Sequence, residues 1–156
     1  MEGKPFRYIE VHLRPQEQIG LHEEDMWELI YIREGQGMRV IADKTAPFSA
    51  GDVTVIPPHI PNCWNFEKDA IDREGKIHSF SVFFSVDFLQ KCALTFPEIK
   101  ERIEQFMQLD VAMEYERKLA QRISNVMLSM RHMDDLQRLS EMVHLVVLMT
   151  EPESST

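Results

Sequence analysis

MWELIYIREGQGMRVI (residues 26–41) and AGDVTVIPPHIPNCW (residues 50–64) are the two segments that decide the fold. In both, β-branched and aromatic residues cluster between glycines and prolines, a pattern typical of strands joined by tight turns. Gly35 and Gly37 turn the chain, and the prolines of residues 57–61 lack the amide protons that a central strand needs. We therefore expect two antiparallel strands, a further strand and a rigid corner.

Further strands are predicted on both sides of this unit, because residues 6–13 and 78–84 alternate with a period of two. Several short strands separated by turn signals indicate a sandwich or barrel. After residue 85 the hydrophobic period becomes helical. The predicted fold class is mainly β plus α: a jelly-roll barrel in residues 1–85, a helical subdomain in residues 86–150, and a polar tail or linker start in residues 151–156.

Composition excludes several classes of protein. The 156 residues carry a formal net charge of −9 and no run of lysine and arginine, so the chain lacks the basic face that holds a nucleic-acid backbone. Cys63 and Cys92 form no CxxC pair, which makes reduced thiols the simpler interpretation. No segment approaches the roughly 20 apolar residues of a membrane span, nor does a signal peptide begin the chain. We expect a cytoplasmic protein with no membrane contact.

Glu28 is the unusual residue of the strand that begins the segment 26–41. Alternation places it on the same face as Ile30 and Ile32, whereas Leu29 and Tyr31 point to the opposite face. Burying a carboxylate without a partner costs several kcal/mol. This position therefore indicates a protonated carboxyl, a hydrogen-bonded partner or a ligand, unless Glu28 lies at a rim and stays in contact with water.

Two motifs in these segments resemble those of a known family. The pattern HxExxxExxxxxxG, from His22 to Gly35, resembles the first cupin motif, and GDxxxxPxxxPN, from Gly51 to Asn62, resembles the second. The phrases WELIYIREGQG, FSAGDV and PHIPNCW are more specifically similar to the N-terminal effector-binding domain of AraC-family transcription regulators. The close resemblance spans residues 20–66 and becomes looser in the helices.

The resemblance implies a small double-stranded β-helix, or jelly-roll, whose interior holds a metal or a small ligand. Metal-binding cupins supply two histidines and a glutamate from the first motif and a third histidine from the second. Here His22 and Glu28 stand at matching places, but Glu24 and Asn62 replace two of the histidines. His59, in the proline corner, is a poor replacement because we expect it at the rim. The sequence therefore predicts neither a metal nor another cofactor.

A polar pocket remains, and the resemblance makes it an effector site. We expect hydrogen bonds from its polar groups to the hydroxyls of a sugar-like metabolite, and aromatic side chains against the apolar face of that metabolite. For each aromatic side chain taken alone, a place in the core is the simpler alternative. The predicted ligand-binding residues are His22, Glu24, Glu28, Asn62, Trp64 and Phe80.

Apolar residues recur at helical spacing in residues 119–130 and again in residues 136–147, so each helix buries one face. The simpler alternative is that this face packs on the barrel. AraC-type regulators pair helices across a two-fold axis, and the resemblance therefore implies a homodimer. The predicted dimerisation residues are Leu119, Ile123, Val126, Met130, Leu136, Leu139, Val143 and Val146.

These expectations combine into one function. The chain is expected to be a non-enzymatic, ligand-sensing and dimerising half of an AraC-type transcription regulator. Nucleic acid would be contacted only through a helix-turn-helix domain that follows residue 156. We then expect either a truncated regulator or a naturally short protein. A metal-dependent cupin enzyme and a stand-alone carbohydrate-binding module remain the alternatives.

Overall fold

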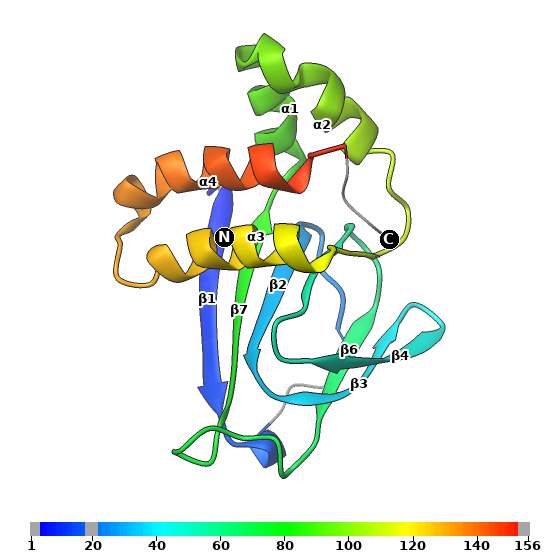
Figure 1. Ribbon diagram of the computed structural model, residues 1–156. Coiled ribbons are helices and arrows are strands. Elements are labelled where there is room, and N and C mark those ends of the chain that lie inside the picture. Colours follow the sequence, from blue (N-terminus) through cyan, green and yellow to red (C-terminus); the bar gives the residue numbers. More distant parts are fainter. Residues whose placement is uncertain (1–3, 18–21, 153–156) are drawn as a thin grey trace.

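The computed structural model describes residues 4–17 and 22–152, and its strands form two antiparallel sheets (Figure 1). The strands are β1 (Phe6–Leu13), β2 (Trp27–Glu34), β3 (Gln36–Ile41), β4 (Lys44–Ser49), β5 (Val53–Ile56), β6 (Asn62–Phe66), β7 (Ile77–Phe84) and β8 (Met113–Glu114). One sheet has the order β1-β7-β2-β5-β8, and the other has the order β4-β3-β6. The predicted β-rich fold is confirmed.

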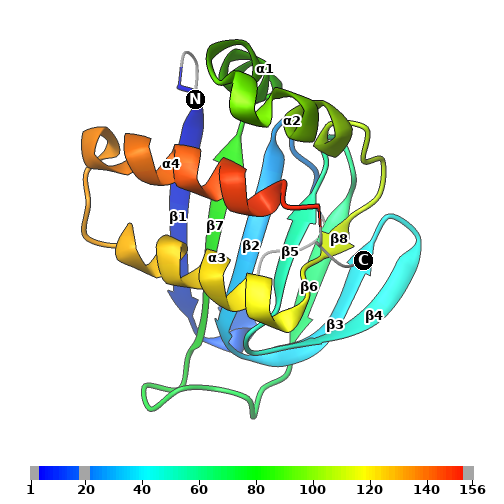
Figure 2. The same ribbon diagram turned by 45° about the horizontal axis from the view of Figure 1, so that its top comes forward.

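Helices occupy most of the second half of the chain. They are α1 (Val86–Thr95), α2 (Lys100–Phe106), α3 (Arg117–Ser129) and α4 (Asp135–Met149), with short 3-10 turns at η1 (Pro15–Glu17) and η2 (Pro97–Ile99). Figure 2 shows α3 and α4 lying across one face of the five-stranded sheet, with α1 and α2 at the end of that sheet. The predicted helical segment after the barrel is therefore confirmed.

Residue type explains where two of these helices begin. The side chain of Ser85 accepts a hydrogen bond from the backbone N–H of Phe88 at the start of α1. At the start of α4, Asp134 and Gln137 form a capping box, in which each side chain bonds the backbone of the other residue. Such caps satisfy amide groups that have no partner inside the helix.

Strand alternation gives the five-stranded sheet two different faces. Glu28 is the register partner of Ile56 on β5 and Phe83 on β7, so these three side chains point to the same side. This is the inner side, toward β3 and β6. Leu29 and its partners point outward, toward α3 and α4. The predicted division of β2 into two faces is confirmed.

The two faces build two hydrophobic cores. The smaller core lies inside the barrel and consists of Ile30, Ile32, Ile41, Phe48, Ile56 and Trp64. The larger core joins the outer face of the sheet to the helices, and Leu29, Phe80, Ile123, Met127 and Leu145 lie at 0% exposure within it. The helices are therefore held by burial of apolar surface against the sheet.

β8 lies within the segment predicted to be helical. Met113 and Glu114 pair with Val55 and Thr54 of β5 and extend the sheet by one short strand. The division of the chain at residue 85 stays a prediction, as does the polar tail, of which residues 153–156 lie outside the described residues. In the described part of the chain, no helix is both long and apolar enough to cross a bilayer.

Candidate functional site

A cavity of about 140 Å3 lies between the two sheets. Its walls come from β1, β2, β6 and β7 and from the segment before β2. The lining residues are Ile9, Val11, Leu13, His22, Glu28, Ile30, Trp64, Phe66, Ile77, Ser79, Ser81 and Phe83. Only His22 and Glu28 among them carry ionisable side chains, so the cavity is an apolar chamber with a small polar end.

Glu28 supplies the carboxylate of that polar end. The residue is 5% exposed, and its Oε2 accepts a hydrogen bond of 3.0 Å from the hydroxyl of Ser81 on the neighbouring strand. Its Oε1 is buried without a hydrogen bond from any of the described residues. A buried acceptor without a donor costs free energy, so this oxygen is a place where a ligand would stabilise the protein.

His22 lies beside Glu28, with its Nε2 3.8 Å from Glu28 Oε1. That separation suits an ion pair but exceeds a hydrogen bond. The backbone of His22 pairs with that of Asn62 through two hydrogen bonds of 2.8 and 3.0 Å. The first and second sequence motifs therefore meet at this point, as their resemblance implied.

Asn62 is 2% exposed but does not line the cavity. Its amide Nδ2 donates to the carbonyl of Ile60, while Oδ1 is buried without a hydrogen bond from the described residues. Trp64 does line the cavity and also packs edge-on against Phe48, so it serves both the core and the cavity wall. Its indole N–H is another buried polar group with no hydrogen bond to the described residues.

Besides Asn62, two predicted ligand-binding residues lie outside the cavity wall. Glu24 forms an ion pair with Arg7 at 3.6 Å and is not part of the cavity wall. Phe80 lies on the outer face of β7, where it is fully buried in the core beneath the helices and contacts Tyr8 and Tyr31. The placement of Phe80 in the pocket was wrong, because its register partner Tyr31 also faces the helices.

Ser79, Ser81 and Phe83 are three cavity residues on β7 that sequence reasoning missed. All three line the cavity from β7, on the face opposite Phe80. The signal was present, since two small polar side chains alternate with large apolar ones in a strand whose eight residues are all buried. A buried serine needs a hydrogen-bond partner, which Ser81 finds in Glu28.

The predicted dimerisation residues divide into two groups. Leu119, Ile123, Val126, Met130 and Val146 are buried against the sheet and the neighbouring helix, at 8% exposure or less. This is the simpler packing that the sequence allowed, and it removes these side chains from any contact with a second chain. Three side chains on α4 remain accessible: Leu136 and Leu139, at 76% and 48% exposure, and the half-buried Val143.

The barrel does not offer the donor set of a metal-binding cupin. One imidazole, His22, and one carboxylate, Glu28, face the cavity, and the amide of Asn62 stands outside its wall. Among the described residues, no group of three or more histidine, cysteine and acidic side chains converges inside the barrel. Three or more such ligands are usual for a transition metal in proteins, so the residues present do not fit one here.

Comparison with known proteins agrees with this architecture. The sequence profile of the cupin domain matches residues 9–70, which include both motifs, strands β2 to β6 and most of β1. This stretch therefore has the cupin fold. It contains His22, Glu28 and Trp64, whereas β7 with Ser79, Ser81 and Phe83 lies beyond the match. No curated protein matched the chain significantly.

Solved structures similar to this chain include a cupin protein from Bacteroides fragilis, with 18% identity and a TM-score of 0.45, covering 53% of this chain and 68% of that one. Pumpkin seed globulin has 17% identity and a TM-score of 0.45, over 51% of this chain and 24% of the globulin. Tomato (Solanum lycopersicum) vicilin has 22% identity and a TM-score of 0.44, over 53% of this chain and 23% of the vicilin. The chain thus spans about a quarter of each seed protein.

Proposed function

We propose that the cavity of the cupin domain binds a small organic effector, and that the chain is the ligand-sensing and dimerising half of an AraC-type transcription regulator in the cytoplasm. The carboxylate of Glu28 carries this proposal. It is buried in an apolar chamber, and one of its oxygens has no hydrogen bond from the described residues. An effector with a donor group would supply the missing hydrogen bond.

The cavity wall favours a compact effector with few polar groups. Eight of the twelve lining residues are apolar, and cavities of roughly 150 Å3 accept a benzene-sized molecule. Each additional hydroxyl of a sugar would need its own partner, because a buried hydroxyl without one costs free energy. An amine on a small apolar body therefore suits the acceptor Glu28, and an alcohol suits both Glu28 and the indole N–H of Trp64, better than a polyhydroxylated sugar does.

The role assigned to the cavity is binding rather than catalysis. His22 and Glu28 are the only ionisable side chains in its wall, and Glu28 already bonds to the hydroxyl of Ser81. A carboxylate is a weak base for a serine hydroxyl, which loses its proton far less readily than a carboxylic acid does. The Ser81–Glu28 pair therefore suits holding a ligand better than activating a nucleophile.

Strands β2 and β7 connect this cavity to the helices. Ser81 on β7 faces the cavity, while its chain neighbours Phe80 and Val82 lie at 0% exposure in the core beneath α3 and α4. A change in the position of β7 on binding would therefore be transmitted to the packing of these helices. In the proposed regulator, this change in helix packing would alter the geometry of the dimer and therefore the spacing of the DNA-binding domains.

Three matched probes test the binding proposal: benzylamine, toluene and L-arabinose. Benzylamine and toluene share a ring, but only benzylamine donates hydrogen bonds, and L-arabinose represents the sugar-like ligand. We expect benzylamine to bind best and Glu28→Gln to weaken it at least about tenfold, the loss of one charge-assisted hydrogen bond. Isothermal titration calorimetry and quenching of Trp64 fluorescence in a Trp27→Phe background measure the affinity.

Glu24→Gln is the control for this experiment, because Glu24 is also an acidic residue of the first motif but lies outside the cavity wall. It should leave benzylamine binding unchanged. Tighter binding of L-arabinose would favour the sugar-like effector. Equal affinities in wild type and Glu28→Gln, or binding of none of the three probes, would contradict the proposed site.

The dimer is tested separately on α4. Leu136, Leu139 and Val143 follow one another at three and four residues and form the exposed stripe of this helix. Sedimentation velocity should show a dimer that Leu139→Glu converts to a monomer. A wild-type monomer at micromolar concentration would remove the dimerising part of the proposal, and a coding sequence without a helix-turn-helix pair after Thr156 would remove the regulatory part.

A further inference from the structure

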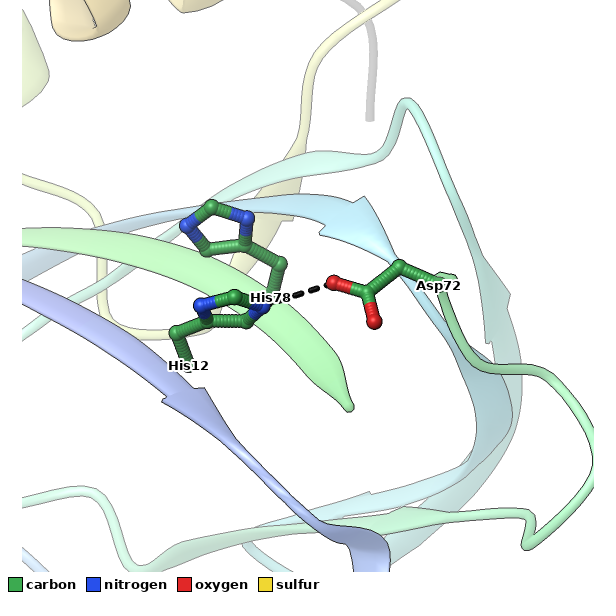
Figure 3. Close-up of side chains that lie close together, drawn as sticks. All are labelled: His12, Asp72 and His78. Carbon is green, nitrogen blue, oxygen red and sulfur yellow. Dashed lines mark hydrogen bonds and ion pairs between the residues drawn. The ribbon is translucent and has the colours of Figure 1, made fainter. Parts of the chain in front are cut away.

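A second cluster of ionisable side chains lies outside the barrel. His12 on β1 and His78 on β7 are register partners, and both project from the outer face of the sheet, opposite the cavity. Asp72 reaches them from the loop between β6 and β7. Figure 3 shows the two imidazole rings one above the other, with the Asp72 carboxylate at their edge.

The three side chains are close enough to share one ion. The ring centroids of His12 and His78 are 4.2 Å apart, and His12 Nε2 lies 2.6 Å from Asp72 Oδ2. One potential metal-ligand atom from each residue lies within 4.8 Å of the other two. In the described part of the chain, these are the three histidine, cysteine or acidic side chains that come close enough to share a metal ion. Two imidazoles and a carboxylate suit zinc and neighbouring divalent transition metals.

A further carboxylate orients one of the rings. His78 Nε2 lies 2.7 Å from Glu10 Oε2, which leaves Nδ1 as the nitrogen that a cation would take. Glu10 is itself held by Arg131, whose Nη2 lies 2.8 Å from the same oxygen. Metal-ligating histidines usually donate their second ring N–H to a carboxylate in this way, which fixes the tautomer and makes the other nitrogen a stronger ligand.

The cluster also has room to adapt. Ligand atoms bound tetrahedrally at 2.0–2.1 Å from zinc lie roughly 3.3 Å apart, so His12 and Asp72 would separate by about 0.7 Å. Asp72 belongs to a surface loop. Its other oxygen, Oδ1, accepts hydrogen bonds from the backbone N–H groups of Glu74 and Lys76 and so stabilises the turn of this loop. Glu74 Oε2, 3.7 Å from His12 Nε2 and on a 65% exposed side chain, is placed to become a fourth ligand.

From this geometry we propose that His12, Asp72 and His78 bind a divalent transition-metal ion of the zinc class on the outer face of the sheet. The ion joins the β6–β7 loop to β1. It is distinct from the barrel position that metal-binding cupins use, and it involves none of the residues that line the effector cavity. The proposal therefore does not depend on the proposed function.

Zinc chloride titrated into the full chain, after removal of metal with a chelator, tests this site. We expect one zinc ion per chain by calorimetry, and Co2+ in its place should give the visible absorption of a bound complex. His12→Gln and Asp72→Asn should abolish binding. Glu10→Gln, which acts only through His78, should weaken binding by about 10- to 100-fold.

Two histidine variants serve as controls: His22→Ala in the barrel and the exposed His59→Ala should both bind zinc as the wild type does. Asp72→Asn keeps the size of the side chain in a surface loop, so its metal-free melting temperature should match the wild type and show that the fold is intact. A wild-type chain that binds no zinc overturns the proposal, because the two hydrogen-bonded pairs then explain the cluster alone. Zinc binding that survives His12→Gln and Asp72→Asn, or that is lost in His22→Ala, also overturns it.

Discussion

Replacing the polar pair inside the barrel with apolar side chains should stabilise the protein while removing its ligand site. The change is the double variant Glu28→Met/Ser81→Ala, which fills the same positions without a charge or a hydroxyl. Glu28 is 5% exposed and Ser81 is 5% exposed, and most of the surrounding wall is apolar. Met and Ala therefore enter an environment that suits them.

The magnitude follows from the two oxygens of Glu28. Oε2 gains about 1.5–3 kcal/mol from its hydrogen bond to Ser81, whereas a buried polar atom such as Oε1 with no donor costs about 1–3 kcal/mol, and more when charged. Replacing both partners with apolar groups of similar shape removes the gain and the cost together, and the buried charge disappears. The gain and the cost nearly cancel, so the net effect comes from removing the buried charge, and we expect a stabilisation of about 1–2 kcal/mol, or about 2–8 °C in melting temperature.

Urea unfolding followed by circular dichroism measures this change, and an unchanged m-value would show that the same surface is buried. Ser81→Ala alone is the matched control. It leaves the carboxylate of Glu28 with no hydrogen bond from β7 and should lower the free energy of unfolding by about 1–3 kcal/mol.

A loss of about 3–5 kcal/mol in the double variant would refute the reasoning. That result is the one expected when a buried ion pair is broken. It would mean that the contact between His22 and Glu28, at 3.8 Å, stabilises the fold, and that Glu28 is structural rather than poised for a ligand.

Three further predictions follow from burial and packing. Burial raises the pKa of the Cys92 thiol, so Ellman's reagent should label the more accessible Cys63 quickly and Cys92 only after unfolding; equal rates would contradict the placement of Cys92. Gly37→Ala should lower the free energy of unfolding in urea by about 1–3 kcal/mol or more, because a Cβ there would lie 1.9 Å from a backbone oxygen of β6, and a neutral effect would show that β3 and β6 lie farther apart. Ile123→Glu should abolish the cooperative thermal transition by burying a charge, whereas Leu94→Glu, at an 80% exposed position of α1 outside the proposed dimer stripe, should change the melting temperature little; similar losses in both would refute the burial assigned to Ile123.

The sequence alone determined most of the strands, although not β4 or β8, and it determined the two faces of β2. A period of two assigns alternate side chains to opposite sides whatever the strand pairs with, so the alternation by itself places Glu28 with Ile30 and Ile32. The two motifs also predicted that His22 and Asn62 come together, and their backbones do pair. Local pattern was sufficient for these features.

The choice of inner face on β7 required the tertiary structure. All eight residues of this strand are buried, half of them in the barrel and half beneath the helices, so alternation alone could not decide which half lines the cavity. Pairing of Ser81 with Ile30 on β2 decided it and placed Phe80 with Tyr31 on the outer side. The same holds for the helices. Their apolar stripes predicted that one face of each helix is buried, but only the tertiary structure showed that the sheet, and not a second chain, covers Ile123.

The cluster at His12 depended most on long-range structure. His12 and Asp72 are 60 residues apart in the chain, and only the antiparallel register of β1 with β7 and the path of the β6–β7 loop bring them into contact. Periodicity and propensity report what each segment prefers by itself. Which segments become neighbours is decided by hydrogen bonding between strands and by burial of their shared faces, and these interactions exist only when the whole chain has folded.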